Sequence, residues 1–159
     1  PVPVDIIDVV KNCQQMVSYD AKRKNIRLQR SIAGNLPQLV GDSARIKRAV
    51  LNLLSNAVKF TPSGGRVSIE ARATPQNPAP MFIEFVVSDT GPGIPEDALH
   101  TVIKPFVHLD PTGRLAETGT GLGLAIAKSI AEAHDGSLSL KSVPGEGTHA
   151  TLSLPAAST

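Results

Sequence analysis

Two glycine-rich segments restrict how the second half of this chain can fold. Residues 89–93 read Asp-Thr-Gly-Pro-Gly and follow a run of apolar residues, and residues 119–124 read Gly-Thr-Gly-Leu-Gly-Leu. Alternating glycines cost backbone entropy on folding, and a plain connector needs only one of them. We therefore expect the backbone at both segments to approach another group closely, where a Cβ atom would intervene.

The spacing of apolar residues predicts the helices and strands around these segments. Spacings of three and four residues indicate helices, alternation indicates strands, and proline and glycine clusters mark turns. We expect helices over residues 5–22, 43–60, 96–103 and 121–134, and strands over 26–32, 38–40, 66–73, 81–88, 137–143 and 148–154. Asp5 and Asp42 are expected to cap the first two helices. Residues 104–120 lack periodicity and are expected to form a mobile loop. Mixed strands with three main helices predict a two-layer α/β sandwich.

The composition favours one soluble globular domain, with 41% hydrophobic and 19% charged residues. The net charge is only +2, and no aromatic residues interleave with the basic cluster at residues 22–30, which argues against nucleic-acid binding. The single cysteine, Cys13, excludes an internal disulfide and a cysteine-based zinc site and indicates a reducing compartment. No apolar run approaches the ~20 residues that span a bilayer. We expect a cytoplasmic location, which is compatible with a parent protein anchored in a membrane.

Three polar side chains form one stripe on the long helix of residues 43–60. Asn52, Asn56 and Lys59 are spaced by four and three residues. The apolar residues lie roughly on the opposite face and are expected to be buried, namely Ile46, Ala49, Val50, Leu53, Leu54, Ala57 and Val58. Such a stripe is typical of a solvated helix surface, but also of a helix that lines a ligand site. Asparagine is a poor helix former, which leans toward the ligand site. Two carboxamides one turn apart suit a hard cation such as Mg²⁺.

Both glycine-rich segments allow two interpretations. Residues 89–93 are good turn chemistry by themselves, but a carboxylate beside two glycines is also able to read the amino edge of a base. Residues 119–124 open a helix, where free N–H groups and the positive end of the dipole favour phosphates. Their glycine spacing matches neither the dinucleotide fingerprint nor a P-loop. The four histidines lack metal-ligand spacing.

Taken in order, the motifs resemble the catalytic ATP-binding domain of bacterial sensor histidine kinases, within the GHKL superfamily. The matching segments are residues 51–62 for the N box, 89–95 for the G1 box, 104–106 for the F box, 119–124 for the G2 box and 145–148 for the last glycine motif. The resemblance covers the chain from about residue 4 to 155. It implies an α+β fold, a two-layer α/β sandwich of the GHKL type, in which a mixed, mainly antiparallel sheet packs against about three helices.

The resemblance also implies ATP and Mg²⁺ as ligands and assigns a role to each matching position. Asn56 would coordinate Mg²⁺ with Asn52 in support, Lys59 would lie against the phosphates, and Asp89 would accept the adenine amino hydrogen with help from Thr148. The other nucleotide-binding positions are Phe60, Gly91, Gly93, Ile94, Phe106, Gly119, Thr120, Gly121, Leu122, Gly123 and Leu124.

The residue at position 52 bears on the reaction. ATPases of the superfamily carry a glutamate there as the base for water, and an asparagine cannot deprotonate water. The resemblance therefore implies transfer of the γ-phosphate to a protein histidine, with catalytic positions at Asn52, Lys59, His108 and Arg114. Many relatives have an aromatic residue and an arginine where Val107 and His108 stand. A pseudokinase that binds nucleotide without transfer is the alternative, and an ATPase of the DNA-handling or chaperone type is disfavoured.

The domain organisation follows from the same resemblance. Residues 1–155 would form the catalytic domain, with an ATP lid at about 104–120, and residues 156–159 would be a linker. The dimerisation domain with the phosphoacceptor histidine would be absent from the chain. The expected partners are that domain and, indirectly, a response regulator receiver domain. We expect no contact with nucleic acid or membrane, and a monomeric fragment.

Overall fold

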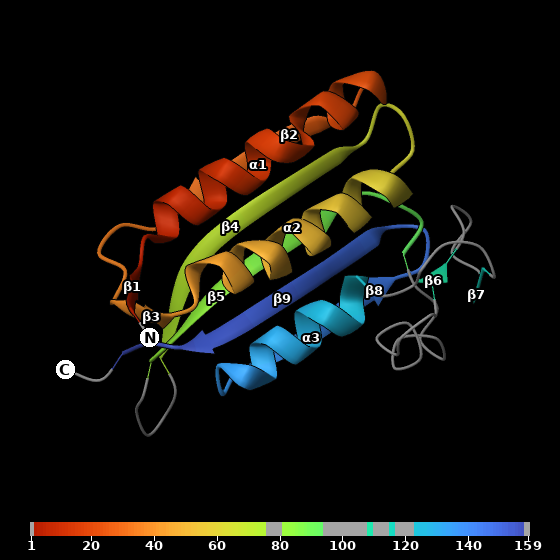
Figure 1. The fold of residues 1–159 in the computed structure, drawn as a ribbon. Coiled ribbons are helices and arrows are strands. Elements are labelled where there is room, and N and C mark those ends of the chain that lie inside the picture. Colours follow the sequence, from red (N-terminus) through yellow and green to blue (C-terminus); the bar gives the residue numbers. More distant parts are fainter. Residues whose placement is uncertain (1, 76–80, 94–107, 110–114, 117–122, 158–159) are drawn as a thin grey trace.

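Three helices cover one face of a five-stranded sheet within the described residues (Figure 1). The computed structural model describes residues 2–75, 81–93, 108–109, 115–116 and 123–157. The helices are α1 (Ile6–Arg23), α2 (Ser43–Phe60) and α3 (Gly123–Ala133). The strands are β1 (Val2–Val4), β2 (Arg27–Ile32), β3 (Leu39–Gly41), β4 (Arg66–Pro75), β5 (Met81–Asp89), β6 (His108–Leu109), β7 (Leu115–Ala116), β8 (Ser137–Val143) and β9 (Gly147–Pro155).

The strand order puts β5 in the middle of the sheet. The order is β2-β4-β5-β9-β8, in which β2 and β4 are parallel and every other pair is antiparallel. The register places Asp89, the last residue of β5, between Val67 of β4 and Thr148 of β9. The expected two-layer α/β sandwich with a mixed, mainly antiparallel sheet is confirmed.

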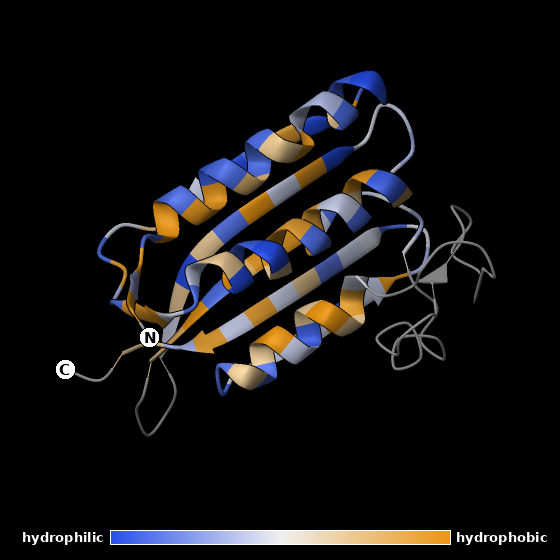
Figure 2. Ribbon diagram, viewed as in Figure 1, coloured by the Kyte–Doolittle hydropathy of each residue, from blue (hydrophilic) through white to orange (hydrophobic). Residues whose placement is uncertain are grey.

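The core fills the space between the helices and the sheet, where the apolar residues of both layers meet (Figure 2). In α2, the buried positions are those that the apolar spacing predicted, namely Ile46, Ala49, Val50, Leu53, Leu54, Ala57 and Val58. The inner face of the sheet contributes Val67, Ile69, Ile83, Phe85, Val87, Leu152 and Leu154. Helix α2 lies between α1 and α3, so both of its sides have a neighbouring helix.

Two aspartates define where the first two helices begin. Asp5 accepts a hydrogen bond from the N–H of Asp8 at 3.1 Å, and Asp42 accepts one from the N–H of Arg45 at 3.2 Å. Each carboxylate satisfies an N–H group that the first helical turn leaves without a partner. Both N-caps agree with the prediction from sequence.

The structure differs from the sequence prediction in two places. Strand β1, which the sequence did not predict, pairs antiparallel with β3. Its three residues are too few to show an alternation of apolar and polar residues. The sequence predicts a loop over 104–120, whereas its described part contains β6 paired antiparallel with β7. The helix expected over 96–103 lies outside the described residues. Among the helices that the structure describes, none has the length and apolar character needed to cross a membrane.

Candidate functional site

Asp89 presents a half-buried carboxylate at the end of the central strand. Its Oδ1 accepts a hydrogen bond from the Gly91 N–H at 2.8 Å, and the Thr148 N–H also donates to the carboxylate. Burial raises the pKa of Asp89 above its ordinary value, because removing the charge from water is unfavourable, while the two N–H groups and the nearby His149 oppose that rise. The strand end therefore holds an acceptor whose orientation is fixed by backbone donors.

Glycines allow three backbone segments to converge on this carboxylate. A Cβ atom at position 91 would lie 3.0 Å from the Asp89 Oδ1 and 3.1 Å from the carbonyl oxygen of Phe60. Gly147 has a φ of +134°, and a Cβ atom there would overlap the Asp89 carbonyl oxygen. The end of α2 and the start of β9 are thus both packed directly against the Asp89 loop.

Ser142 of β8 is a neighbour of this site that sequence reasoning missed. Its hydroxyl donates to the Gly147 carbonyl at 2.9 Å and lies 3.1 Å from the hydroxyl of Thr148. Thr148 therefore reaches Asp89 through its backbone N–H, while its hydroxyl is hydrogen-bonded toward β8. No motif marks Ser142, since it is one of several polar residues in an edge strand.

The polar stripe of α2 faces the beginning of α3. A Cβ atom at position 123 would lie 3.3 Å from Nδ2 and 3.6 Å from Oδ1 of Asn56, so Gly123 brings the first turn of α3 against this carboxamide. Asn52, one turn earlier, has a buried Nδ2 without a hydrogen-bond partner in the part of the chain that the structure describes. An unpaired buried amide is unfavourable. The contact of Asn56 with α3 and the unpaired amide of Asn52 favour the interpretation of the stripe as a ligand site over that of a solvated surface.

The last turn of α2 completes the described part of the site. Lys59 is exposed, and its Nζ lies 5.3 Å from the centroid of the Phe60 ring. The Phe60 carbonyl contacts the Asp89 loop through Gly91. A continuous row of contacts therefore runs from Asp89 along the end of α2 to Asn56 and the N-terminus of α3. The row begins with an acceptor at Asp89. The last turn of α2 adds the Lys59 ammonium group, and the start of α3 adds helix N–H groups, both of which favour anions.

The described residues contain no group of three or more histidine, cysteine, aspartate or glutamate side chains able to hold a metal ion. A divalent cation that is bound to phosphates brings oxygen ligands of its own and needs few from the protein. The carboxamide oxygens of Asn56, beside Gly123, and of Asn52, one turn earlier, are neutral ligands of the kind that such a hard cation prefers. The unpaired Nδ2 of Asn52 is a hydrogen-bond donor, which suits a phosphate oxygen. The residues that are present fit Mg²⁺ carried by a phosphate ligand.

Several predicted site positions are not tested by this structure. Leu124 is described and packs partly buried against the core. For His108, only the backbone position in β6 is described. The positions that lie outside the described residues are Ile94, Phe106, Arg114, Gly119, Thr120, Gly121 and Leu122.

Comparisons with known proteins agree with this geometry. The family of histidine kinase-, DNA gyrase B-, and HSP90-like ATPases matches residues 41–158. The signal transduction histidine-protein kinase/phosphatase MprB of Mycobacterium sp. (strain KMS) is 40% identical over 156 residues, which cover 96% of this chain and 28% of that protein. Across four relatives, the chain spans between 13% and 28% of the length of the relative.

Solved structures show the same fold over nearly the whole chain. A structure of the mycobacterial sensor histidine kinase MprB has a TM-score of 0.79 at 32% identity and covers 99% of this chain and 98% of that one. The crystal structure of full-length ShkA in complex with AMPPNP has a TM-score of 0.84 at 30% identity and covers 99% of this chain and 31% of that one.

Proposed function

The chain belongs to the family of histidine kinase-, DNA gyrase B-, and HSP90-like ATPases, and we propose that it binds Mg-ATP and donates the γ-phosphate to a histidine of a separate dimerisation domain. The observation that carries this proposal is the row of contacts from Asp89 to Asn56, with an asparagine at position 52. In this proposal, residues 1–155 form the catalytic domain. The phosphoacceptor lies in another part of the parent protein, which then passes the phosphate to a response regulator receiver domain.

Asp89 reads the adenine base in this proposal. The exocyclic amino group of adenine is a donor, and an ionised carboxylate is an acceptor only, so the pair is complementary. The backbone N–H groups of Gly91 and Thr148 hold the carboxylate in place. Guanine carries a carbonyl oxygen at the corresponding ring position, and that acceptor would repel the carboxylate. Asp89 therefore selects adenine nucleotides.

The end of α2 and the start of α3 hold the phosphates. Lys59 supplies a positive charge, and the first turn of α3 supplies N–H groups that have no partner within the helix. Asn56, supported by Asn52, would hold the cation, which would supply positive charge to the phosphates. Phosphoryl transfer needs mainly positioning and charge stabilisation, and these residues supply both.

Position 52 supports a kinase rather than a hydrolase. A carboxamide cannot remove a proton from water, so this side chain cannot activate a water molecule for attack on the γ-phosphate. A histidine side chain is itself a nucleophile and needs no such base. The second candidate, a pseudokinase that binds nucleotide and signals by conformation, is favoured by Val107 and His108, where many relatives carry an aromatic residue and an arginine.

Calorimetric titration with a non-hydrolysable ATP analogue tests the binding site. We expect micromolar affinity that weakens when Mg²⁺ is removed, and no comparable affinity for the guanine analogue. A folded chain that binds neither nucleotide would overturn the proposal.

Transfer is tested separately, with γ-labelled ATP and a supplied helical hairpin that carries the phosphoacceptor histidine. We expect label on the wild-type hairpin and none on a hairpin with that histidine replaced by alanine. Nucleotide binding without any label would favour the pseudokinase, and steady ATP turnover by the chain alone would favour an ATPase.

A further inference from the structure

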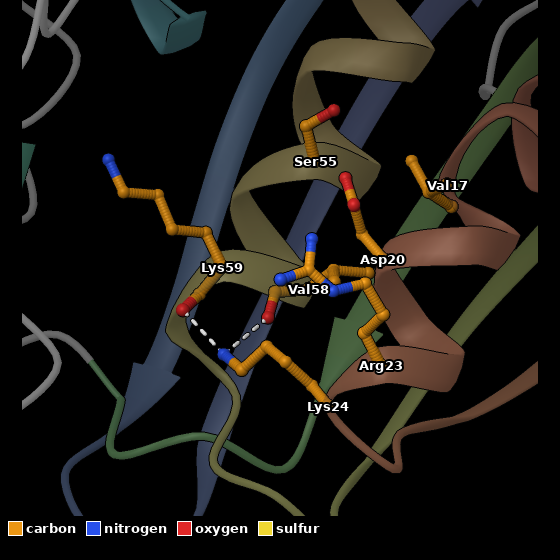
Figure 3. Close-up of a pocket in the computed structure, with 7 residues that line it drawn as sticks. All are labelled: Val17, Asp20, Arg23, Lys24, Ser55, Val58 and Lys59. Carbon is orange, nitrogen blue, oxygen red and sulfur yellow. Dashed lines mark hydrogen bonds between the residues drawn. The ribbon is translucent and has the colours of Figure 1, made fainter.

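Lys24 connects the end of α1 to the end of α2. It is the C-cap residue of α1, and its Nζ donates hydrogen bonds to the carbonyl oxygens of Val58 at 2.9 Å and Lys59 at 2.8 Å (Figure 3). The last four carbonyl groups of a helix have no partner within the helix, and a cation there also interacts favourably with the negative end of the dipole. One lysine of a neighbouring helix therefore caps two carbonyl groups at the end of α2.

The backbone around Lys24 is held in place on both sides. Asn25 adopts a left-handed conformation with φ of +56°, and the N–H of Ile26 donates back to the Ala21 carbonyl at 2.8 Å, which ends α1 in a tight turn. The N–H of Gly64, in the loop after α2, donates to the Asn25 carbonyl at 3.0 Å. Because the turn at residues 24–26 is hydrogen-bonded to both α1 and the loop after α2, the backbone position of Lys24 is fixed.

The neighbouring basic residues at this corner have other environments. Arg23 lies over the ring of Tyr19, with its guanidinium carbon 5.7 Å from the ring centroid, and Lys22 is exposed. Residues of α1 and α2 line a hollow of about 510 Å³ at this place, and Lys24 and Lys59 both contribute to it. Figure 3 shows the ammonium group of Lys24 directed at the two carbonyl oxygens, while the side chain of Lys59 extends away from them.

The capped turn is the part of α2 that meets the candidate nucleotide site. It carries Lys59, whose ammonium group lies over the Phe60 ring, and the Phe60 carbonyl contacts the Asp89 loop at Gly91. A helix end without a cap frays, because its terminal carbonyls then compete for water. If the last turn of α2 frayed, Lys59 and Phe60 would lose their fixed placement relative to Asp89.

We propose that Lys24 is a positioning residue for nucleotide binding, which holds the last turn of α2 against the Asp89 loop by capping the carbonyl groups of Val58 and Lys59. Lys24 lies on the α1 side of α2 and acts through the helix end. It needs no contact with the nucleotide. This inference rests on the proposed function, because the nucleotide is the ligand whose affinity reports the position of the turn.

Four variants separate positioning from charge and from stability. Lys24→Met removes the donors and keeps an apolar stem, and Lys24→Arg keeps two donors. Lys22→Met removes a neighbouring exposed charge, and Val17→Ala removes buried volume from α1 without touching the α2 carbonyl groups. Each variant is titrated with the non-hydrolysable ATP analogue and Mg²⁺, and its melting temperature is measured.

We expect Lys24→Met to raise the Kd of the analogue about fivefold, which is ~1 kcal/mol. Lys24→Arg should recover most of this loss, and Lys22→Met should bind like the wild type. Val17→Ala should melt earlier and yet bind with wild-type affinity at temperatures where it is folded. Unchanged affinity in Lys24→Met, or an equal loss in Lys22→Met, would overturn the inference.

Hydrogen exchange of the Thr61 amide gives a second readout that needs no nucleotide. This amide donates to the Ala57 carbonyl at 3.0 Å and closes the last turn of α2. Lys24→Met should speed its exchange about fivefold, and Lys22→Met should leave it unchanged. A wild-type chain that binds no nucleotide would contradict the proposed function, whereas unchanged Thr61 exchange in Lys24→Met would contradict the role of Lys24 itself.

Discussion

The two faces of α2 belong to one helix of 18 residues but have different roles. One face packs seven apolar side chains into the core, including Leu53 and Leu54. The other presents Asn52, Asn56 and Lys59, of which Asn52 has a buried amide without a partner in the described part of the chain. The comparison shows that stability comes from the first face, while the second face leaves a polar group unsatisfied. Substitutions on the two faces should therefore have separable effects.

The largest effect is expected from Leu53→Ala on the buried face. Leu53 is 2% exposed, so its removal leaves a cavity and should lower the free energy of unfolding by about 2–5 kcal/mol. Chemical denaturation measures this loss, with Ser55→Ala on the exposed surface of the same helix as the control. At temperatures below its melting temperature, Leu53→Ala should bind the ATP analogue with wild-type affinity. A loss of affinity as large as the loss of stability would break the separation of the two faces.

A large loss of affinity with little change in stability is expected from Asp89→Asn. The carboxamide places a donor where the adenine amino group also donates, so we expect affinity for the analogue to fall by about 100-fold, or ~2.7 kcal/mol. Titration calorimetry measures the change, and circular dichroism checks the fold. If the variant bound the analogue as tightly as the wild type, Asp89 would not be the residue that reads the base.

A smaller effect is expected from Asn56→Ala on the polar face. Loss of one neutral ligand of the cation should weaken binding of the Mg²⁺–analogue complex about tenfold, or ~1.4 kcal/mol. Affinity measured without Mg²⁺ should hardly change, so the variant should lose the Mg²⁺ dependence of the wild type. The free energy of unfolding should stay within about 0.5 kcal/mol of the wild type. A variant that kept the full Mg²⁺ dependence would remove Asn56 from the cation site.

The smallest expected effect is on how the stability of the fold depends on pH, and not on nucleotide affinity. Burial raises the pKa of Asp89, so the carboxyl group binds its proton more tightly in the folded state than in the unfolded chain. The stability that Asp89 contributes is complete below the unfolded pKa, near ~3.9, and is lost as pH rises through the raised folded pKa. The side chain introduced by Asp89→Asn carries no charge at any of these pH values, so the variant should not lose this stability as pH rises. At neutral pH the variant should melt at a slightly higher temperature than the wild type, and the difference should vanish below the unfolded pKa.

Melting curves of both proteins across this pH range measure the difference. A variant that melted earlier than the wild type at neutral pH would show that the hydrogen bonds from Gly91 and Thr148 to the charged carboxylate outweigh its burial. In that case, Asp89 would stabilise the fold as well as the site, and the contrast between core and site would be weaker at this strand end.

Local patterns in the sequence predicted most of the elements. Asp5 and Asp42 are N-caps as expected, because a cap depends on residues within the same turn. The buried face of α2 also follows from the spacing of its own residues. Asn52, Asn56 and Asp89 were predicted as site residues because each belongs to a short motif. The structure brings Asn56 to Gly123 and Asp89 to Gly91 and Thr148.

Other features depend on residues that are far apart in the chain, and no local pattern marks them. The imidazole Nε2 of His134 accepts a hydrogen bond from the N–H of Asp42 at 3.1 Å, although 92 residues separate the two. Likewise, Lys24 reaches the carbonyl groups at the end of α2, and Ser142 reaches Thr148. The sequence by itself determined the helices, the main strands and the motif residues, since these depend on near neighbours. Only the tertiary structure decided which helix ends and strand ends meet, because those contacts depend on how the whole sheet is paired and covered.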